Sequence, residues 1–214
     1  GPNAPSLLSP GMNVTNRQTV AAFRWSAATD VGSSGIKNYK ISVDGITNVT
    51  TTLSNVQGLS EGVHSWTVRA FDNENNAGLS APSRTLTIDS LPPSVVGLTS
   101  PLDSATLSTG SVTLTWNASS DATTAVKGYV LETALDSGFM GSHFRFVVGT
   151  SFTTNVANGL TIFWRVKAFD LPGNTNLSSS ARSFTVDTSV IVPSLISPVN
   201  LAALATGNPS YQWT

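Results

Sequence analysis

Aspartates are the residues in this sequence whose type and position could support chemistry. Asp30 and Asp121 each follow an apolar stretch that ends in tryptophan, and Asp72 and Asp170 each directly follow an Ala-Phe pair. Asp89 closes another apolar stretch. Carboxylate oxygens are the hard donors that calcium prefers, so aspartates from different segments can form a calcium site where a fold brings them together. Whether they converge depends on the elements that carry them.

No residue pattern typical of a catalytic site occurs. The two histidines, His64 and His143, have no serine, cysteine or carboxylate at catalytic spacing, and there is no phosphate-binding glycine loop or His-x-x-x-His pair. Cysteine is absent, which excludes disulfides, thiolate metal sites and a cysteine nucleophile. We therefore expect that the chain is not an enzyme and has no cofactor, with calcium as the one ion to consider.

Several segments of the sequence repeat. Three of them begin with Ser-Pro and reach a tryptophan after the same number of residues, at 9–25, 100–116 and 197–213. A second pattern, Trp-x-Val-x-Ala-Phe-Asp, occurs at 66–72 and 164–170. Large apolar residues alternate with polar ones in these segments, and this period of two predicts half-buried antiparallel β-strands. The tryptophans fall on the apolar side of each alternation, so we expect them in the core and not on a sugar-binding surface.

Together with Tyr39 and Tyr129 on the expected third strands, these patterns resemble the fibronectin type III family, in the variety common in large bacterial surface and secreted proteins. The resemblance implies an all-β fold of two tandem seven-stranded antiparallel β-sandwiches, fibronectin type III or immunoglobulin-like, plus the first two strands of a third repeat. The place of the family's tyrosine corner holds His64 in the first repeat and Ile162 in the second. The corner hydrogen bond is therefore expected to be absent or replaced.

The repeats also set the expected domain boundaries. Residues 1–2 are expected to be the remnant of a cleaved expression tag, residues 3–90 the first sandwich and residues 91–189 the second. Residues 190–214 would form a partial third repeat, which cannot bury a core with only two strands.

The sandwich topology predicts where these aspartates lie in the fold. The loop after the second strand and the loop before the seventh lie at the same end of such a sandwich. Asp121 and Asp170 occupy these loops in the second repeat, beside the joint that carries Asp89, so we expect the three to converge between the repeats, where calcium would stiffen the array. Asp30 and Asp72 occupy the same loops in the first repeat. The alternative is that each aspartate caps its own turn through side-chain to backbone hydrogen bonds.

The second repeat carries an insertion in its middle, around residues 135–144. It brings Phe139, Met140 and Phe144 into a connection at the edge of a sheet. Loops on a rigid scaffold commonly carry binding residues, and exposed apolar clusters mark contact sites, so these three are candidates for ligand contact. The alternative is a longer hairpin that buries the same side chains in its own sheet.

The composition excludes several classes of protein. Hydrophobic residues make up 40% of the 214 residues, enough for packed cores, while charged residues make up 11% and the net charge is −1. The lack of a basic cluster argues against nucleic-acid binding. No apolar run reaches the roughly 20 residues that span a bilayer, so we expect no membrane insertion.

These features predict a structural role. We expect spacer, or stalk, repeats of a long extracellular bacterial surface protein or adhesin, whose partners are neighbouring repeats of the same chain and a host or cell-surface protein or glycan. One alternative is a protein- or glycan-binding module that uses the loops of the second repeat. Another is an accessory module of a secreted polysaccharide-degrading enzyme.

Overall fold

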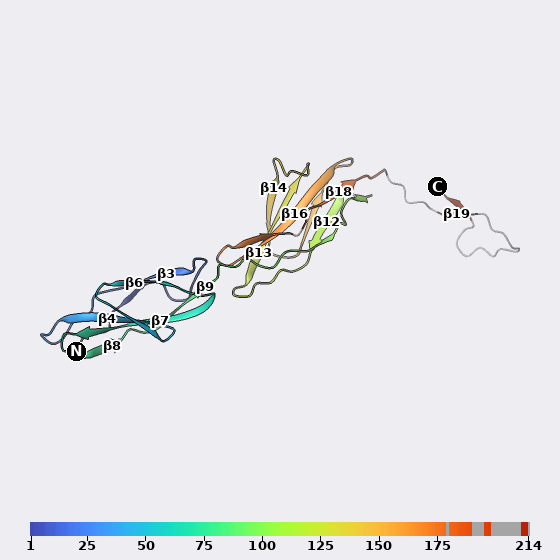
Figure 1. Cartoon of the computed structure of the whole chain (residues 1–214). Helices are drawn as coiled ribbons and strands as arrows, with labels where there is room; N and C mark the ends of the chain where they lie inside the picture. The colour runs from blue at the N-terminus through green and yellow to red at the C-terminus, as the bar shows by residue number, and fades with distance from the viewer. Residues whose placement is uncertain (179, 190–194, 198–210, 214) are drawn as a thin grey trace, which may run out of the picture. The chain divides into compact units, whose positions relative to one another are not determined.

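The computed structural model describes residues 1–178, 180–189, 195–197 and 211–213, and the regular structure among them is β-strand (Figure 1). This part of the chain contains no helix long and apolar enough to cross a membrane. The chain divides into two compact units. The first comprises Gly1–Val96, Ala118–Val130 and Lys167–Ser179, and the second comprises Gly97–Asn117, Leu131–Val166 and Ser180–Thr214. The boundaries expected at residues 90 and 189 follow the sequence repeats and stay predictions.

The first nine strands form two sheets around one core. The smaller sheet has the order β1 (Leu7–Ser9), β3 (Val20–Trp25), β6 (Ser54–Gly58). The larger sheet has the order β2 (Val14–Asn16), β9 (Arg84–Ile88), β7 (Gly62–Asp72), β4 (Ile36–Val43), β5 (Ile46–Thr50), with β8 (Ala77–Ser80) also paired to β7. These strands pair antiparallel, except that β2 runs parallel to β9.

The next nine strands repeat this order. One sheet contains β10 (Leu98–Ser100), β12 (Ser111–Trp116) and β15 (Ser151–Asn155). The other contains β11 (Ala105–Leu107), β18 (Arg182–Val186), β16 (Thr161–Asp170), β13 (Val126–Ala134) and β14 (His143–Val147), with β17 (Thr175–Leu177) paired to β16. Both β13 and β16 begin in one compact unit and end in the other.

The structure divides each repeat into nine strand segments, whereas the sequence predicts seven strands. The difference arises because two strands are interrupted. The first strand is divided into β1, which pairs with β3 in the smaller sheet, and β2, which pairs with β9 in the larger sheet. The last strand pairs with β7 twice, as β8 and as β9, on either side of Pro82, which has no N–H group to donate to a ladder. Joining these segments leaves seven strands.

The tryptophans lie in the cores, as their alternation predicts. Four of them, Trp25, Trp66, Trp116 and Trp164, are at most 3% exposed. In the first repeat the Phe23 and Trp66 rings lie 4.9 Å apart and join the two sheets. The prediction of core packing is therefore confirmed for these four tryptophans.

The Ser-Pro to Trp spacing corresponds to one backbone pairing in all three repeats. Leu7 lies opposite Trp25, and Leu98 lies opposite Trp116, each with a shift in register before the serine. The same pairing joins β19 (Leu195–Ser197) to β20 (Gln212–Trp213), where Leu195 lies opposite Trp213. The rest of the expected third repeat lies outside the described residues.

Candidate functional site

Three predicted site residues lie together in the structure. One oxygen from each of the Asp89, Asp121 and Asp170 carboxylates lies within 4.8 Å of the other two. Asp89 and Asp170 are fully buried and Asp121 is half-buried. All three belong to the first compact unit. We call these residues the acidic triad.

Different backbone elements position the three side chains. Asp89 follows β9 directly, and its backbone N–H donates to the carbonyl of Asn16 at 2.9 Å, which extends the pairing of β2 with β9. Asp170 is the last residue of β16, and Asp121 lies in the connection between β12 and β13. The acidic triad thus joins segments that are far apart in the sequence.

Turn capping, the alternative role for these aspartates, accounts for part of the acidic triad. Asp121 Oδ1 accepts hydrogen bonds from the backbone N–H groups of Thr123 and Thr124, both at 2.9 Å. Asp170 Oδ1 accepts from the backbone of Gly173 at 2.8 Å and of Asn174 at 2.7 Å. Within the acidic triad, capping leaves two buried oxygens without a hydrogen-bond partner, Asp89 Oδ1 and Asp121 Oδ2.

The electrostatics of the acidic triad are unfavourable for three free carboxylates. Burial raises the pKa of Asp89, and the nearby charges of Asp121 and Asp170 raise it further, against a lowering by the hydrogen bond from the Thr124 hydroxyl. None of the salt bridges found among the described residues involves the triad.

Asp30 and Asp72, the corresponding aspartates of the first repeat, behave differently. Hydrogen bonds from the Ser34 hydroxyl and from two backbone N–H groups lower the pKa of Asp30. Burial acts to raise the pKa of Asp72, but its hydrogen bonds to Asn76 and Glu74 outweigh this and lower it. Each carboxylate caps its own turn, and within the described residues no third acidic group joins them. The structure thus places these two in turn-capping roles.

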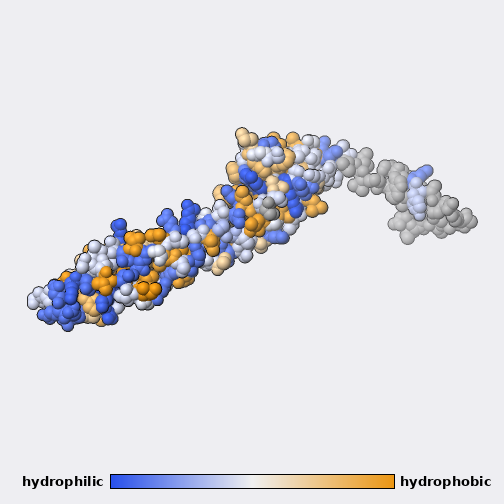
Figure 2. All heavy atoms as spheres, in the orientation of Figure 1, coloured by the Kyte–Doolittle hydropathy of each residue, from blue (hydrophilic) through white to orange (hydrophobic). Residues whose placement is uncertain are grey.

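The inserted residues of the second repeat form the connection between β13 and β14, from Leu135 to Ser142, where the first repeat has only Asp44 and Gly45 between β4 and β5. The three candidate contact residues do not form one surface. The Phe139 ring is half-buried beneath the Arg165 guanidinium at 4.1 Å, whereas Met140 is 79% and Phe144 is 52% exposed. Figure 2 shows apolar and polar residues interspersed on the visible face of each unit.

A buried ion pair anchors this inserted connection. Glu132 on β13 is only 8% exposed and accepts a 2.6 Å hydrogen bond from Arg165 Nε on β16. Its other oxygen accepts from the Ser142 hydroxyl at 2.8 Å. This network is not among the sites predicted from the sequence; its one sequence signal is Glu132, an acid beside the apolar residues of β13 that needs a partner when buried.

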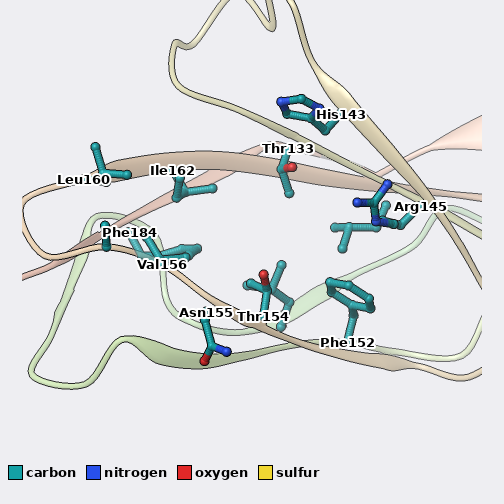
Figure 3. Close-up of a pocket in the computed structure, with 13 residues that line it drawn as sticks. Thr133, His143, Arg145, Phe152, Thr154, Asn155, Val156, Leu160, Ile162 and Phe184 are labelled. Carbon is teal, nitrogen blue, oxygen red and sulfur yellow. The ribbon is translucent and has the colours of Figure 1, made fainter.

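A cavity of about 370 Å³ lies in the second unit (Figure 3). His143 and Arg145 of β14 lie on one side of it, and Phe152 and Thr154 of β15 lie on the other. Its floor is formed by the core side chains Leu114, Leu131 and Phe184. The volume falls in the range of small-ligand sites, which are lined mainly by apolar side chains with a few polar groups. In the sequence, the polar side of this cavity is indicated only by His143 and Arg145, which lie two residues apart and so share one face of a strand.

His64 replaces the tyrosine corner in the first repeat. Its ring is buried, with Nδ1 at 2.6 Å from the Asp44 carboxylate and Nε2 at 2.9 Å from the carbonyl of Ser60. The second bond returns to the backbone a few residues upstream, as the family's tyrosine does. Both ring nitrogens are engaged, so the structure gives His64 a structural role. No local sequence pattern indicates its carboxylate partner, Asp44.

The strand order decides the fold class. Each repeat combines a three-stranded sheet with a larger sheet, and the second repeat reproduces the order of the first strand for strand. The chain consists of fibronectin type III-like repeats. Sandwiches of this fold host many different functions, so the fold alone assigns no activity to the chain.

Sequence comparison connects the repeats to two polysaccharide-degrading enzymes. The chain is 29% identical to exoglucanase B of Cellulomonas fimi over 229 residues, which cover all of the chain and 19% of the relative. It is 30% identical to chitinase A1 of Niallia circulans over 189 residues, which cover 84% of the chain and 26% of the relative. The chain therefore spans about a fifth and a quarter of the lengths of these relatives. No family model matches it.

Comparison with solved structures gives fibronectin type III modules. One is a structure of the fibronectin(III)-like modules of CbhA from Clostridium thermocellum, with a TM-score of 0.48 and 14% identity over 88% of this chain and 97% of that one. Another is the FN1–FN3 segment of chicken CNTN1, with a TM-score of 0.40 and 16% identity over 100% of this chain and 75% of that one.

Proposed function

We propose that these fibronectin type III-like repeats are non-catalytic accessory modules of a secreted polysaccharide-degrading enzyme, in which they act as a spacer. The observation that carries the proposal is the match of the whole chain to a fifth of an exoglucanase, together with the match to a chitinase. Both relatives are named for polymeric carbohydrate substrates, and most of their length lies outside the match. A second region of the same protein would then supply catalysis.

The proposed location is extracellular, because polymers such as cellulose and chitin are too large to enter a cell. The repeats suit this location chemically, since they contain no cysteine that could be oxidised. The mechanical role is the one that the sequence predicts for a stalk, but the proposed parent is an enzyme and not an adhesin.

The proposal is tested in the parent protein. Residues 3–189 would be replaced by a flexible linker in the full-length enzyme, and the rates would be measured on a soluble oligosaccharide and on insoluble cellulose or chitin. We expect an unchanged kcat/KM on the soluble substrate and a several-fold slower hydrolysis of the insoluble polymer. A parent without activity on polysaccharides, or equal rates of both enzymes on the polymer, would refute the proposal.

A second candidate function is glycan contact through the second repeat. The exposed side chains of Met140 and Phe144 favour it, because aromatic and apolar groups in water are the surfaces on which sugar rings pack.

Sedimentation of the chain with insoluble cellulose and chitin separates the two functions. A pure spacer remains in the supernatant. A glycan-binding module sediments with the polymer, and Phe144→Ala together with Met140→Ala would abolish this without changing the melting temperature. Leu79→Ala in the first repeat, at a side chain that is 76% exposed, serves as the matched control.

A further inference from the structure

We propose that Asp89, Asp121 and Asp170 form a calcium-binding site in the first compact unit. This inference goes beyond the accessory role and does not depend on it. Two observations carry it: the three carboxylates converge within 4.8 Å, and two buried oxygens among them, Asp89 Oδ1 and Asp121 Oδ2, have no hydrogen-bond partner in the described structure.

The unpartnered oxygens point to a cation because buried charge requires compensation. A buried polar atom without a partner loses its hydration and gains nothing in return, and a buried carboxylate loses more than a neutral group. Asp89 is fully buried, and the described residues supply its carboxylate with the Thr124 hydroxyl and the Leu91 backbone N–H but with no positive charge. A bound cation would satisfy both unpartnered oxygens and screen the repulsion among the three groups.

The donor set selects calcium among the common cations. All three groups are carboxylates, hard oxygen donors, whereas zinc and copper prefer sites with nitrogen or sulfur. Oxygens on opposite sides of a calcium ion lie at about twice the Ca–O distance of roughly 2.3–2.6 Å. The oxygens of the acidic triad, all within 4.8 Å of one another, fit within this span. Magnesium, with bonds of about 2.0–2.1 Å, requires a tighter arrangement.

The surrounding hydrogen bonds orient the donors before an ion binds. Both Asp121 and Asp170 are held through one oxygen by backbone N–H groups of their own turns. Asn174 adds a link, because its side-chain amide donates both to Asp170 Oδ2 at 2.9 Å and to the backbone carbonyl of Asp89 at 2.8 Å. Turn capping thus fixes the carboxylates in place and supports the site rather than competing with it. Water and second carboxylate oxygens would complete the coordination of the ion.

The first test is direct binding of calcium by the intact chain. After removal of metal with EDTA and dialysis, titration with CaCl2 in a calorimeter should show one site. The melting temperature in excess CaCl2 should exceed that in EDTA by about 5 °C, because an ion that binds only the folded state stabilises it. MgCl2 at the same concentration should give a smaller rise. No heat and equal melting temperatures would overturn the proposal, and an equal response to magnesium would overturn the assignment to calcium.

Variants separate the site from an effect on folding. Asp89→Asn should weaken calcium binding at least about tenfold, while its melting temperature in EDTA should equal or exceed that of the wild type, because the substitution removes like-charge repulsion. Asp30→Asn is the matched control, since it alters a turn-capping aspartate outside the acidic triad, and it should leave the calcium response unchanged. A calcium response retained in Asp89→Asn, or lost equally in Asp30→Asn, would overturn the site.

Discussion

At the scale of single residues, His64 shows how a family feature is replaced by different chemistry. Burial acts to lower the pKa of His64, but the hydrogen bonds to Asp44 and Ser60 outweigh burial and raise it above 6.5. For Asp44, burial acts to raise the pKa, and the bonds from His64 and the Ser65 backbone outweigh this and lower it below 3.8. The folded state therefore favours the imidazolium and the carboxylate together.

The pair gives the first repeat a defined dependence of stability on pH. The contribution of His64 is complete below pH 6.5 and is lost as the pH rises through its higher folded pKa. The contribution of Asp44 is present above pH 3.8 and is lost as the pH falls through its lower folded pKa. Asp44→Asn should therefore lower the free energy of unfolding by about 1 kcal/mol at pH 6, a value reduced for the partial exposure of Asp44. At pH 9 the difference in free energy of unfolding between the wild type and Asp44→Asn should be much smaller. Urea denaturation at both pH values measures it.

A second aspartate provides the control for this experiment. Asp136 occupies the corresponding connection of the second repeat, and its carboxylate accepts from the backbone N–H groups of Gly138 and Met140. Asp136→Asn should have an effect that does not change between pH 6 and 9. An effect of Asp44→Asn that is equally constant over this range would show that the charged pair does not contribute.

At the scale of elements, two equivalent tyrosines tie the third strand of each repeat to the connection before it. Tyr39 Oη accepts the buried N–H of Ala28 at 3.0 Å, and Tyr129 Oη accepts the half-buried N–H of Ser119 at 2.9 Å. Tyr39→Phe should lower the free energy of unfolding by about 1–2 kcal/mol, because the Ala28 N–H is left buried without an acceptor. Tyr129→Phe should cost less, because water can reach Ser119. Equal losses in thermal denaturation would contradict this ranking.

The inserted connection depends on the ion pair beneath it. Arg165→Ala should lower the free energy of unfolding by about 2 kcal/mol, since Glu132 stays buried without its cationic partner while Arg165 itself is one-third exposed. Ser142→Ala removes only a hydrogen bond to the same carboxylate and should cost about 1 kcal/mol. Chemical denaturation measures both values, and hydrogen exchange should show faster opening of residues 135–142 in Arg165→Ala. Unchanged exchange in residues 135–142 would show that the connection is stable without the ion pair.

The sequence predicts elements better than it predicts contacts between them. A period of two and one recurrent spacing are enough for the strands and for the pairing of Leu7 with Trp25, because both are local consequences of backbone geometry. The acidic triad follows from topology, since the loops of a sandwich gather at its ends. The contact of Asp44 with His64 depends on the register of β4 against β7, in which Val43 lies opposite Trp66. No local pattern encodes that register.

The triad also shows where prediction from sequence ends. The sequence alone does not distinguish turn capping from calcium binding, because an aspartate beside a turn is compatible with both roles. In the structure, capping engages one oxygen of Asp121 and leaves the other without a partner. Hydrogen bonds assigned atom by atom are needed for this distinction, and residue types and spacing do not supply them.

At the scale of the whole molecule, the two repeats bury separate sets of large side chains. The core of the first repeat consists of residues between Leu7 and Ile88, with Phe23 and Trp66 in contact at its centre. In the second repeat, Trp164 of β16 and Phe184 of β18 are completely buried. Contacts within a repeat should therefore dominate the cooperativity of unfolding, as they do in tandem arrays.

This separation predicts two calorimetric transitions that respond to different substitutions. Trp66→Ala should lower the free energy of unfolding of the first repeat by about 3–5 kcal/mol, because it leaves a large cavity in a packed core, and should leave the transition of the second repeat in place. Trp164→Ala should do the reverse. The control is Leu79→Ala, at an exposed side chain, which should move neither transition. If either core substitution shifted both transitions equally, the chain would unfold as one cooperative body, and a spacer built from independent repeats would be the wrong description of it.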